Sequence, residues 1–230
     1  MTLPRVETPI FEGTLASTRE TIKFRPFLVK EEKILMLASE SEEFKDMVSA
    51  CCQIVTNCCG GKIDGYDLSM FDLQDLFVQI RAKSVGETAD FTLTCGECEK
   101  RTPYTLALEE MKVQGLDNLP DAFIKVSDEV GVNLKWPNAG IAAQAEELTD
   151  DELVAKCIDY VVDGEETFSI KEYPIEEVTS FIEDLPIDAM EKMREFFQRM
   201  PRLEHIVEYK CPHCESDNKI NINGYEHFFG

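Results

Sequence analysis

Two cysteine pairs are the residues of this chain whose type and spacing could do chemistry. They lie in the segments Cys95–Cys98 (Cys-Gly-Glu-Cys) and Cys211–Cys214 (Cys-Pro-His-Cys). Two intervening residues allow a tight turn to direct both thiolates at one metal ion. Four thiolates together would complete a tetrahedral site. The pattern therefore predicts a structural zinc site with the ligands Cys95, Cys98, Cys211 and Cys214.

Strand-like sequence flanks both pairs, at residues 91–94, 102–106, 205–210 and 219–223. Strand, C-x-x-C turn and strand, repeated once, is the arrangement of a zinc ribbon. The pairs are much farther apart than in a short ribbon, so the intervening chain must loop out as an insertion. A site without an open coordination position is structural, and metal binding there would drive local folding.

Other uses of the cysteine pairs fit less well. A redox pair normally lies where a strand meets a helix, and no helical pattern follows Cys98 or Cys214. Disulfides need an oxidising compartment, and residues 1–7 lack the pattern of a secretory signal. His213 could replace one sulfur ligand, although the four cysteines complete the site without it. A reducing compartment and an all-cysteine site are therefore expected.

Composition indicates a globular protein. The chain has 230 residues, 43% of them hydrophobic and 14 of them phenylalanine, enough for one core or two small ones. No apolar run approaches the ~18 to 20 residues that span a bilayer. We therefore expect a soluble protein that is made inside the cell.

The net charge of −22 bears on possible partners. Nucleic-acid binding depends on clustered Lys and Arg. Only Lys100, Arg101, Lys210 and Lys219 lie near the cysteine pairs, among several acidic residues. A nucleic-acid-associated zinc ribbon thus remains the less favoured alternative, and salt-dependent binding to DNA or RNA would identify it. The charge better suits solubility or a basic protein partner.

Five further cysteines lie outside the two pairs. Cys157 stands alone, and the other four form adjacent pairs seven residues apart on one predicted helix: Cys51, Cys52, Cys58 and Cys59. We interpret them as small buried hydrophobic residues. A second metal cluster is the alternative, but one straight helix cannot wrap four such thiols around a single ion.

Periodicity and capping residues predict the elements before the first pair. Residues 1–20 show no period and are expected to form an arm or loop. A strand is predicted at residues 21–24, and helices at 29–38, at 42–58 and from Met70. Gly60 and Gly61 would end the second helix, and Ser69 would cap the third.

Between the pairs, residues 111–202 predict a hairpin followed by helices. The hairpin strands are residues 123–126 and 132–136, and the helices are residues 150–163, 175–185 and 187–200. Thr149 and Glu152 have the spacing of a capping box, and Gly164 would end the first of these helices. Most of the excess acid lies here, which is typical of solvated helix faces and sometimes of a docking surface for a basic partner.

The predicted fold class is α+β: an N-terminal helical region, a discontinuous four-cysteine zinc ribbon, and an acidic α/β insertion between the two zinc knuckles. The expected parts are an arm (1–20), the helical region (21–87), the ribbon halves (88–110 and 203–225) and the inserted region (111–202). The sequence lacks a glycine-rich phosphate loop, a nucleophile elbow and an H-E-x-x-H motif. We therefore expect no catalytic residues, no small-molecule substrate and no enzymatic activity.

Three stretches of the chain are distinctive: Ile22–Met36, Phe71–Glu87, and Phe196–Leu203 leading to Val207–Cys214. They resemble the baseplate hub proteins of T-even-like contractile-tailed bacteriophages, a family of hub subunits and hub assembly proteins. The resemblance implies a structural or assembly role in the tail baseplate of the virion. It also implies synthesis and assembly in the host cytoplasm, with other hub and tail proteins as partners.

Two questions stay open within this resemblance. The protein could be a permanent hub component, or a transient hub-assembly chaperone that is absent from the mature virion. The segment Arg25–Met36 could form part of a protein-binding face, because apolar residues there alternate with both charge signs. Alternatively, Phe24, Phe27 and Leu35 simply belong to the core.

Overall fold

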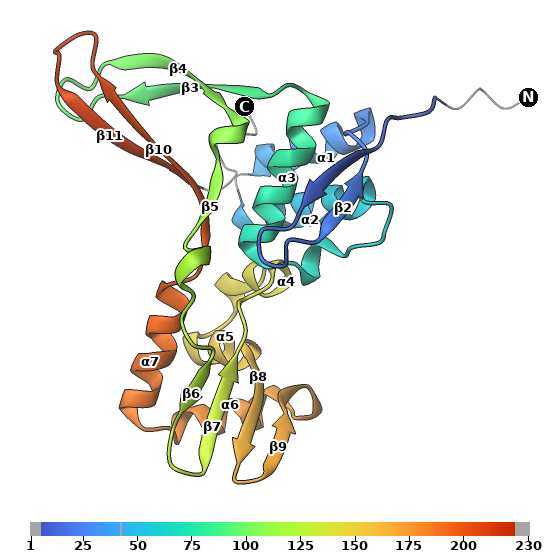
Figure 1. Ribbon diagram of the computed structural model, residues 1–230, viewed down its shortest axis with the longest axis vertical. Coiled ribbons are helices and arrows are strands. Elements are labelled where there is room, and N and C mark those ends of the chain that lie inside the picture. Colours follow the sequence, from blue (N-terminus) through green and yellow to red (C-terminus); the bar gives the residue numbers. More distant parts are fainter. Residues whose placement is uncertain (1–5, 42, 224–230) are drawn as a thin grey trace, which may run out of the picture.

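The structure is a computed structural model that describes residues 6–41 and 43–223. Figure 1 shows three parts: a helical body formed by the N-terminal elements, a hairpin arm that extends from it, and a lower lobe. Buried apolar residues form two separate clusters, one in the body and the hairpin arm and one in the lobe. The fold is thus a mixture of helices and small sheets, as the sequence predicts.

The helical body contains a two-stranded sheet, β1 (Phe11–Thr14) and β2 (Thr21–Phe24), and three helices, α1 (Val29–Ser41), α2 (Phe44–Cys58) and α3 (Met70–Ser84). Helix α3 forms the centre because its apolar stripe is fully buried. The Ser69 hydroxyl accepts a hydrogen bond from the Asp72 amide (3.2 Å), which confirms the predicted cap. Gly60 and Gly61 take left-handed φ angles of 67° and 73° after α2, as expected for a helix end.

Strand β1 corrects the prediction that residues 1–20 form an arm or loop; residues 1–5 lie outside the described part. The four residues of β1 have too little pattern to predict a strand. Pairing with β2, in the register Phe11↔Phe24, stabilises it. The side-chain amide of Gln79 on α3 also bonds both backbone groups of Thr14, at 3.1 and 3.0 Å. These partners are distant in sequence, so a local pattern could not reveal them.

The hairpin arm consists of two antiparallel hairpins that extend together from the body (Figure 1). Strand β3 (Thr88–Thr94) pairs with β4 (Arg101–Ala107), and β10 (Arg202–Lys210) pairs with β11 (Asp217–Asn223). The sequence did not predict β5 (Lys112–Gln114), which pairs with β10 in the register Leu203↔Val113. The intervening chain therefore leaves and re-enters the arm on neighbouring strands.

The lower lobe contains a four-stranded antiparallel sheet in the order β6-β7-β8-β9. Its strands are β6 (Phe123–Lys125), β7 (Val130–Leu134), β8 (Ile158–Asp163) and β9 (Glu166–Ser169). Its helices are α5 (Asp150–Lys156), α6 (Ile175–Glu183) and α7 (Ile187–Gln198). Short helix α4 (Ala139–Ala142) joins the lobe to the body, where the Ala139 amide bonds the Leu68 carbonyl at 2.8 Å. Short 3-10 turns lie at Gly65–Asp67, Leu108–Glu110, Leu116–Asn118, Ala145–Glu147 and Ile170–Glu172.

One predicted helix of the lobe is wrong in its second half. The segment 150–163 divides into α5, which ends at Lys156, and strand β8. Gly164, with φ of 58°, lies in the turn between β8 and β9 and does not end a helix. The run Ile158-Asp-Tyr-Val-Val is rich in β-branched and aromatic residues, and it pairs with strands on both sides. The Thr149–Glu152 capping box is present, as predicted.

Candidate metal centre

The two C-x-x-C turns have the same backbone geometry. The Cys95 amide bonds the Lys100 carbonyl at 3.0 Å, and the Cys211 amide bonds the Ser216 carbonyl at 2.9 Å. In each turn the residue after the second cysteine, Glu99 or Glu215, has a positive φ near 60°. Each hairpin therefore directs its two thiols out of one tight turn.

The structure brings all four cysteine sulfurs to one point. The Sγ atoms of Cys95 and Cys214 lie 3.7 Å apart, as do those of Cys98 and Cys211. All four ligand atoms lie within 4.8 Å of one another. Sulfurs about 2.3 Å from a central zinc ion form a tetrahedron with edges of roughly 3.8 Å. The sulfurs are too far apart for disulfides, which need about 2.05 Å, and their spacing suits a tetrahedral ion.

Two residues beside the second turn support the cluster, and the cysteine pattern alone does not predict either of them. The Ser216 hydroxyl lies 3.2 Å from the Cys95 sulfur and 3.1 Å from the Cys214 sulfur. The Asn218 side chain accepts a hydrogen bond from the Gly96 amide (3.0 Å) and donates one to the Cys95 sulfur (3.5 Å). Asn218 thus links the two turns directly. The only sign of Ser216 and Asn218 in the sequence is that they lie two and four residues after the ligand candidate Cys214.

The electrostatics of the cluster favour a cation. Hydrogen bonds from the Ser216 hydroxyl and from the Cys98 and Glu97 amides lower the pKa of Cys95 to about 5. Ser216 likewise lowers the pKa of Cys214. A hydrogen bond from the Lys100 amide would lower the pKa of Cys98, but desolvation and the other three sulfurs raise it to about 12. Four adjacent thiolates repel one another, and a bound metal ion would offset that repulsion.

His213 does not belong to the cluster. Its side chain is exposed, and only its backbone amide contacts a ligand, bonding the Cys211 sulfur at 3.4 Å. Cys95 and Cys211 are buried, Cys98 is half-buried and Cys214 is exposed. The group that could hold a metal ion therefore offers four sulfurs, and the chain leaves the Cys214 side of the cluster open to solvent.

The four sulfurs join two hairpins of the arm. A comparison with known proteins identifies the family of the chain. The chain matches the family model of the T4 bacteriophage base plate protein over residues 7–230. It belongs to this family. No match was found among the curated proteins or among the solved structures.

Family membership assigns this baseplate protein to the tail baseplate of a phage virion, with other phage tail proteins as partners. It supports a structural role, which agrees with the missing catalytic motifs. Within residues 6–41 and 43–223, no helix is both long enough and apolar enough to cross a membrane.

The other cysteines of the baseplate protein lie in its cores, as interpreted from the sequence. Cys51, Cys52, Cys58 and Cys59 are buried in the helical body. Desolvation raises the pKa of Cys52 and of Cys58 to about 12, so these thiols stay protonated. Desolvation also raises the pKa of Cys157 in the lower lobe, to about 11. Among the described residues, only the four cysteines of the two turns form a group that could hold a metal.

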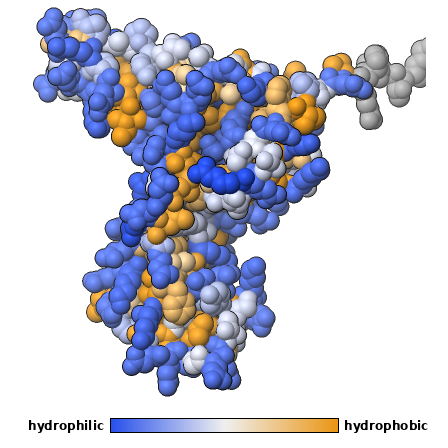
Figure 2. All heavy atoms as spheres, viewed as in Figure 1, coloured by the Kyte–Doolittle hydropathy of each residue, from blue (hydrophilic) through white to orange (hydrophobic). Residues whose placement is uncertain are grey.

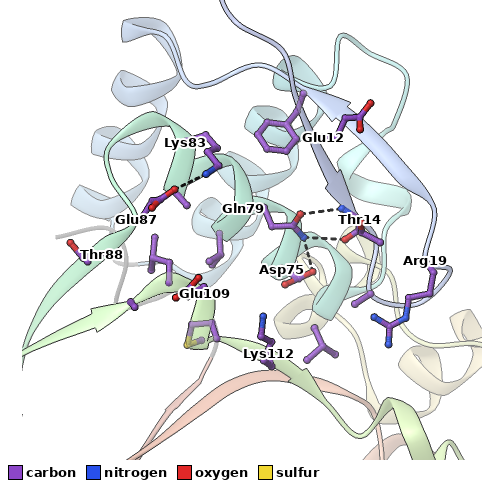
Figure 3. A pocket seen from close by; sticks show the side chains of 18 of the residues that line it. Glu12, Thr14, Arg19, Asp75, Gln79, Lys83, Glu87, Thr88, Glu109 and Lys112 are labelled. Carbon is purple, nitrogen blue, oxygen red and sulfur yellow. Dashed lines mark hydrogen bonds and ion pairs between the residues drawn. The ribbon is translucent and has the colours of Figure 1, made fainter.

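A cavity of about 700 Å³ in the baseplate protein lies away from the sulfurs, beside β1 and α3. Figure 3 shows Asp75, Gln79 and Thr14 joined in one hydrogen-bonded chain on its wall. Desolvation raises the pKa of Asp75 to about 6, although the bond from Gln79 (2.8 Å) opposes this shift. Among the described residues that line the cavity there is no histidine or cysteine. Gln79 holds β1 on α3 here, so we assign the wall a structural role.

Proposed function

We propose that this protein is a non-enzymatic baseplate hub protein whose hairpin arm is closed by a structural zinc ion. The observation that carries the proposal is the meeting of four sulfurs from turns more than a hundred residues apart. A fully cysteine-ligated tetrahedral site suits Zn²⁺ and leaves no position for a substrate. Zinc would there join two turns that Ser216 and Asn218 already link by hydrogen bonds.

Zinc would also hold the ends of the inserted chain together. The insertion begins after β4 and ends at β10. The short antiparallel pairing of β5 with β10 joins its two ends. A metal cross-link at the tip of the arm keeps β3–β4 beside β10–β11, which limits how the lower lobe can move relative to the helical body. A rigid arrangement of this kind suits a component that contacts several neighbours in a baseplate.

Helix α1 supports a role in protein contacts. Val29, Met36 and Leu37 are 67%, 58% and 68% exposed. Phe24 is buried, and the Phe27 ring packs 5.7 Å from that of Phe77, so part of the segment Arg25–Met36 contributes to the core. The exposed side of α1 is the part of this segment that could contact another tail protein.

The first experiment measures metal. Native mass spectrometry with elemental analysis should find one zinc ion per chain. Cys95→Ser with Cys211→Ser should abolish binding, whereas Cys157→Ala, at a buried cysteine outside the cluster, should retain it. Iron in place of zinc would change the metal assignment, and a folded wild-type chain without any metal would contradict the proposal.

The second experiment tests the role in the particle. Mass spectrometry of purified virions should detect the protein if it is a permanent hub component. Its absence from virions, together with failed baseplate assembly when its gene is removed, would instead identify a transient assembly chaperone. Met36→Ser with Leu37→Ser should reduce co-purification with other tail proteins and leave stability unchanged. Lys33→Ala, an exposed change on the same helix, is the control.

The nucleic-acid alternative has little support around the turns. Lys219, one of the four basic residues there, pairs with Glu208 at 2.9 Å. Binding of DNA or RNA at low salt, weakening steeply as salt is added, would revive that alternative.

A further inference from the structure

A second feature with binding potential lies in the lower lobe, far from the sulfurs. It is a groove of about 350 Å³ between the sheet and helix α6. Strands β7, β8 and β9 contribute Val130, Val161 and Phe168, and α6 contributes Val178 and Phe181. The groove is therefore apolar at its base.

The apolar walls of the groove are open to solvent. Phe168, Ile170 and Phe181 are only half-buried, and Tyr173 is 40% exposed. Figure 2 shows apolar residues emerging between hydrophilic ones over the lower lobe. Exposed aromatic surface of this kind is costly in water unless another molecule covers it.

Charge indicates what that molecule is. Asp163 and Glu177 line the groove and are exposed, and no lysine or arginine lines it. Within the fully described stretch 121–200, twenty Asp and Glu residues face seven Lys and Arg. Only two ion pairs form inside that stretch, Lys125 with Asp128 and Lys192 with Asp188. The groove thus lies in a strong negative field that internal pairing leaves largely uncompensated.

We propose that this groove binds a basic segment of another protein, inserting one apolar side chain of that segment while flanking Lys or Arg residues pair with Asp163 and Glu177. The volume lies near the lower end of the range of roughly 300 to 1,000 Å³ for small binding pockets. It therefore accepts one or two side chains and not the face of a whole helix. The acidic rim repels nucleic acid and acidic peptides, and it attracts a basic segment at long range.

This inference goes beyond the zinc-closed scaffold and does not depend on it. The groove is built from β7, β8, β9 and α6, none of which carries a ligand cysteine. A chain that lacks zinc would refute the proposed function while leaving the groove in place.

The test uses the full-length chain and fluorescein-labelled nine-residue peptides. The probes carry a central Leu or Phe flanked by Lys and Arg. Two matched sets replace the central residue by Ser, or the basic residues by Glu. Only the basic peptides with an apolar centre should bind in 50 mM salt. In 500 mM salt their affinity should fall by about tenfold or more, because Debye screening shortens the range of the rim charges.

Two double variants separate the groove from the general field. Asp163→Lys with Glu177→Lys should weaken binding by about tenfold or more. Glu183→Lys with Asp184→Lys changes the net charge by the same amount, at exposed residues of the same lobe that do not line the groove. That control should weaken binding by less than about threefold. Circular dichroism and the unfolding midpoint verify that each variant is folded.

Three results would overturn the proposal. One is that no basic peptide with an apolar centre binds in 50 mM salt. Another is that the Ser-centred peptides bind equally well, which would show that the groove itself is not used. The third is an equal loss in both double variants, which would reduce the interaction to diffuse attraction by the acidic lobe.

Discussion

The hairpin arm and the lower lobe are both built on antiparallel strands, but different forces hold them. The lobe has its own apolar core, in which Val132 and Met193 are fully buried and Phe196 stacks on Trp136 with ring centroids 3.9 Å apart. In the arm, the buried apolar residues join the core of the body and continue along the hairpins as far as Leu93, two residues before Cys95. At its tip the buried residues are Cys95 and Cys211. We infer that the lobe folds by apolar burial and the arm tip by its sulfurs.

Removal of the metal ligands should separate the behaviour of the arm from that of the lobe most strongly. Structural zinc supplies roughly 10 kcal/mol or more of apparent binding free energy in small zinc-dependent folds. Cys95→Ser with Cys211→Ser should therefore give the largest effect of all. Hydrogen exchange should accelerate by orders of magnitude in β3–β4 and β10–β11 and remain unchanged in β6–β9.

Cys157→Ala is the matched control, because it changes a buried cysteine of the lobe and leaves the sulfur cluster intact. The hairpin arm of this variant should keep the wild-type protection against hydrogen exchange. An arm that stays protected without its ligands would show that strand pairing alone stabilises it, and the contrast with the lobe would be lost.

The converse change acts on the lobe. Phe196→Ala deletes a ring that is 3% exposed and stacked on Trp136. Replacing a buried aromatic by alanine costs about 3 to 5 kcal/mol. Trp136 is the only tryptophan of the chain, so its fluorescence during denaturant unfolding reports this loss. Zinc content should remain that of the wild type.

Ile187→Ala is the control for the lobe, since Ile187 is 79% exposed. It should change the unfolding free energy by no more than about 0.5 kcal/mol. A comparable loss in both variants would mean that the Trp136–Phe196 stack does not contribute as the contacts suggest.

The same contrast explains what the sequence could predict. The C-x-x-C turns, the Ser69 cap, the Thr149–Glu152 box and Gly60–Gly61 are local signals, each complete within a few residues. All of them appear in the structure where the pattern placed them. The proximity of the two cysteine pairs could be predicted because a tetrahedral metal site needs four thiolates and each pair supplies two.

The features that the sequence did not reveal depend on distant partners. Strand β5 exists through its pairing with β10, and β1 through β2 and Gln79. The segment after Lys156 has β-branched and aromatic residues, but it follows a well-capped helix, and its pairing with β7 and β9 decides that it is a strand. Asn218 gains its role from Gly96, which lies 122 residues earlier. No local period encodes such contacts.

A smaller effect concerns pH and the helical body. Burial raises the pKa of Asp75 on α3 to about 6, from the ordinary 3.8. The unfolded chain therefore loses this proton before the folded chain does, so the stability linked to Asp75 is present below about pH 4 and is lost as pH rises to 6. Asp75→Asn removes that loss and should stabilise the protein at pH 7 by about 1 to 3 kcal/mol. The gain should vanish near pH 4.

Unfolding midpoints measured between pH 4 and 7 test this linkage. Asp117→Asn, at an exposed carboxylate beyond β5, should behave as the wild type throughout. A pH-independent gain in Asp75→Asn would show that the substitution acts through packing and not through the proton.

The smallest expected effect comes from a change that weakens a single helix of the lobe. The Thr149 hydroxyl accepts from the Glu152 amide at 3.3 Å, and the Glu152 carboxylate accepts from the Thr149 amide at 2.8 Å. Replacing an N-cap Thr by Ala costs about 1 kcal/mol, so Thr149→Ala should lower the unfolding free energy seen by Trp136 by that amount. Thr149→Ser keeps the hydroxyl and should restore most of it.

The pH dependence of this loss identifies its cause. The backbone bond from Thr149, and then its side chain, lower the pKa of Glu152. That stabilisation is present above the ordinary pKa of the carboxyl group and is lost as pH falls through the lowered value. Thr149→Ala keeps the backbone amide and loses only the side-chain bond to the carboxylate, so the difference between wild type and Thr149→Ala should shrink in acid by that side-chain part alone. If Thr149→Ser is as unstable as Thr149→Ala at neutral pH, the box does not hold α5, and the lobe depends on its apolar core alone.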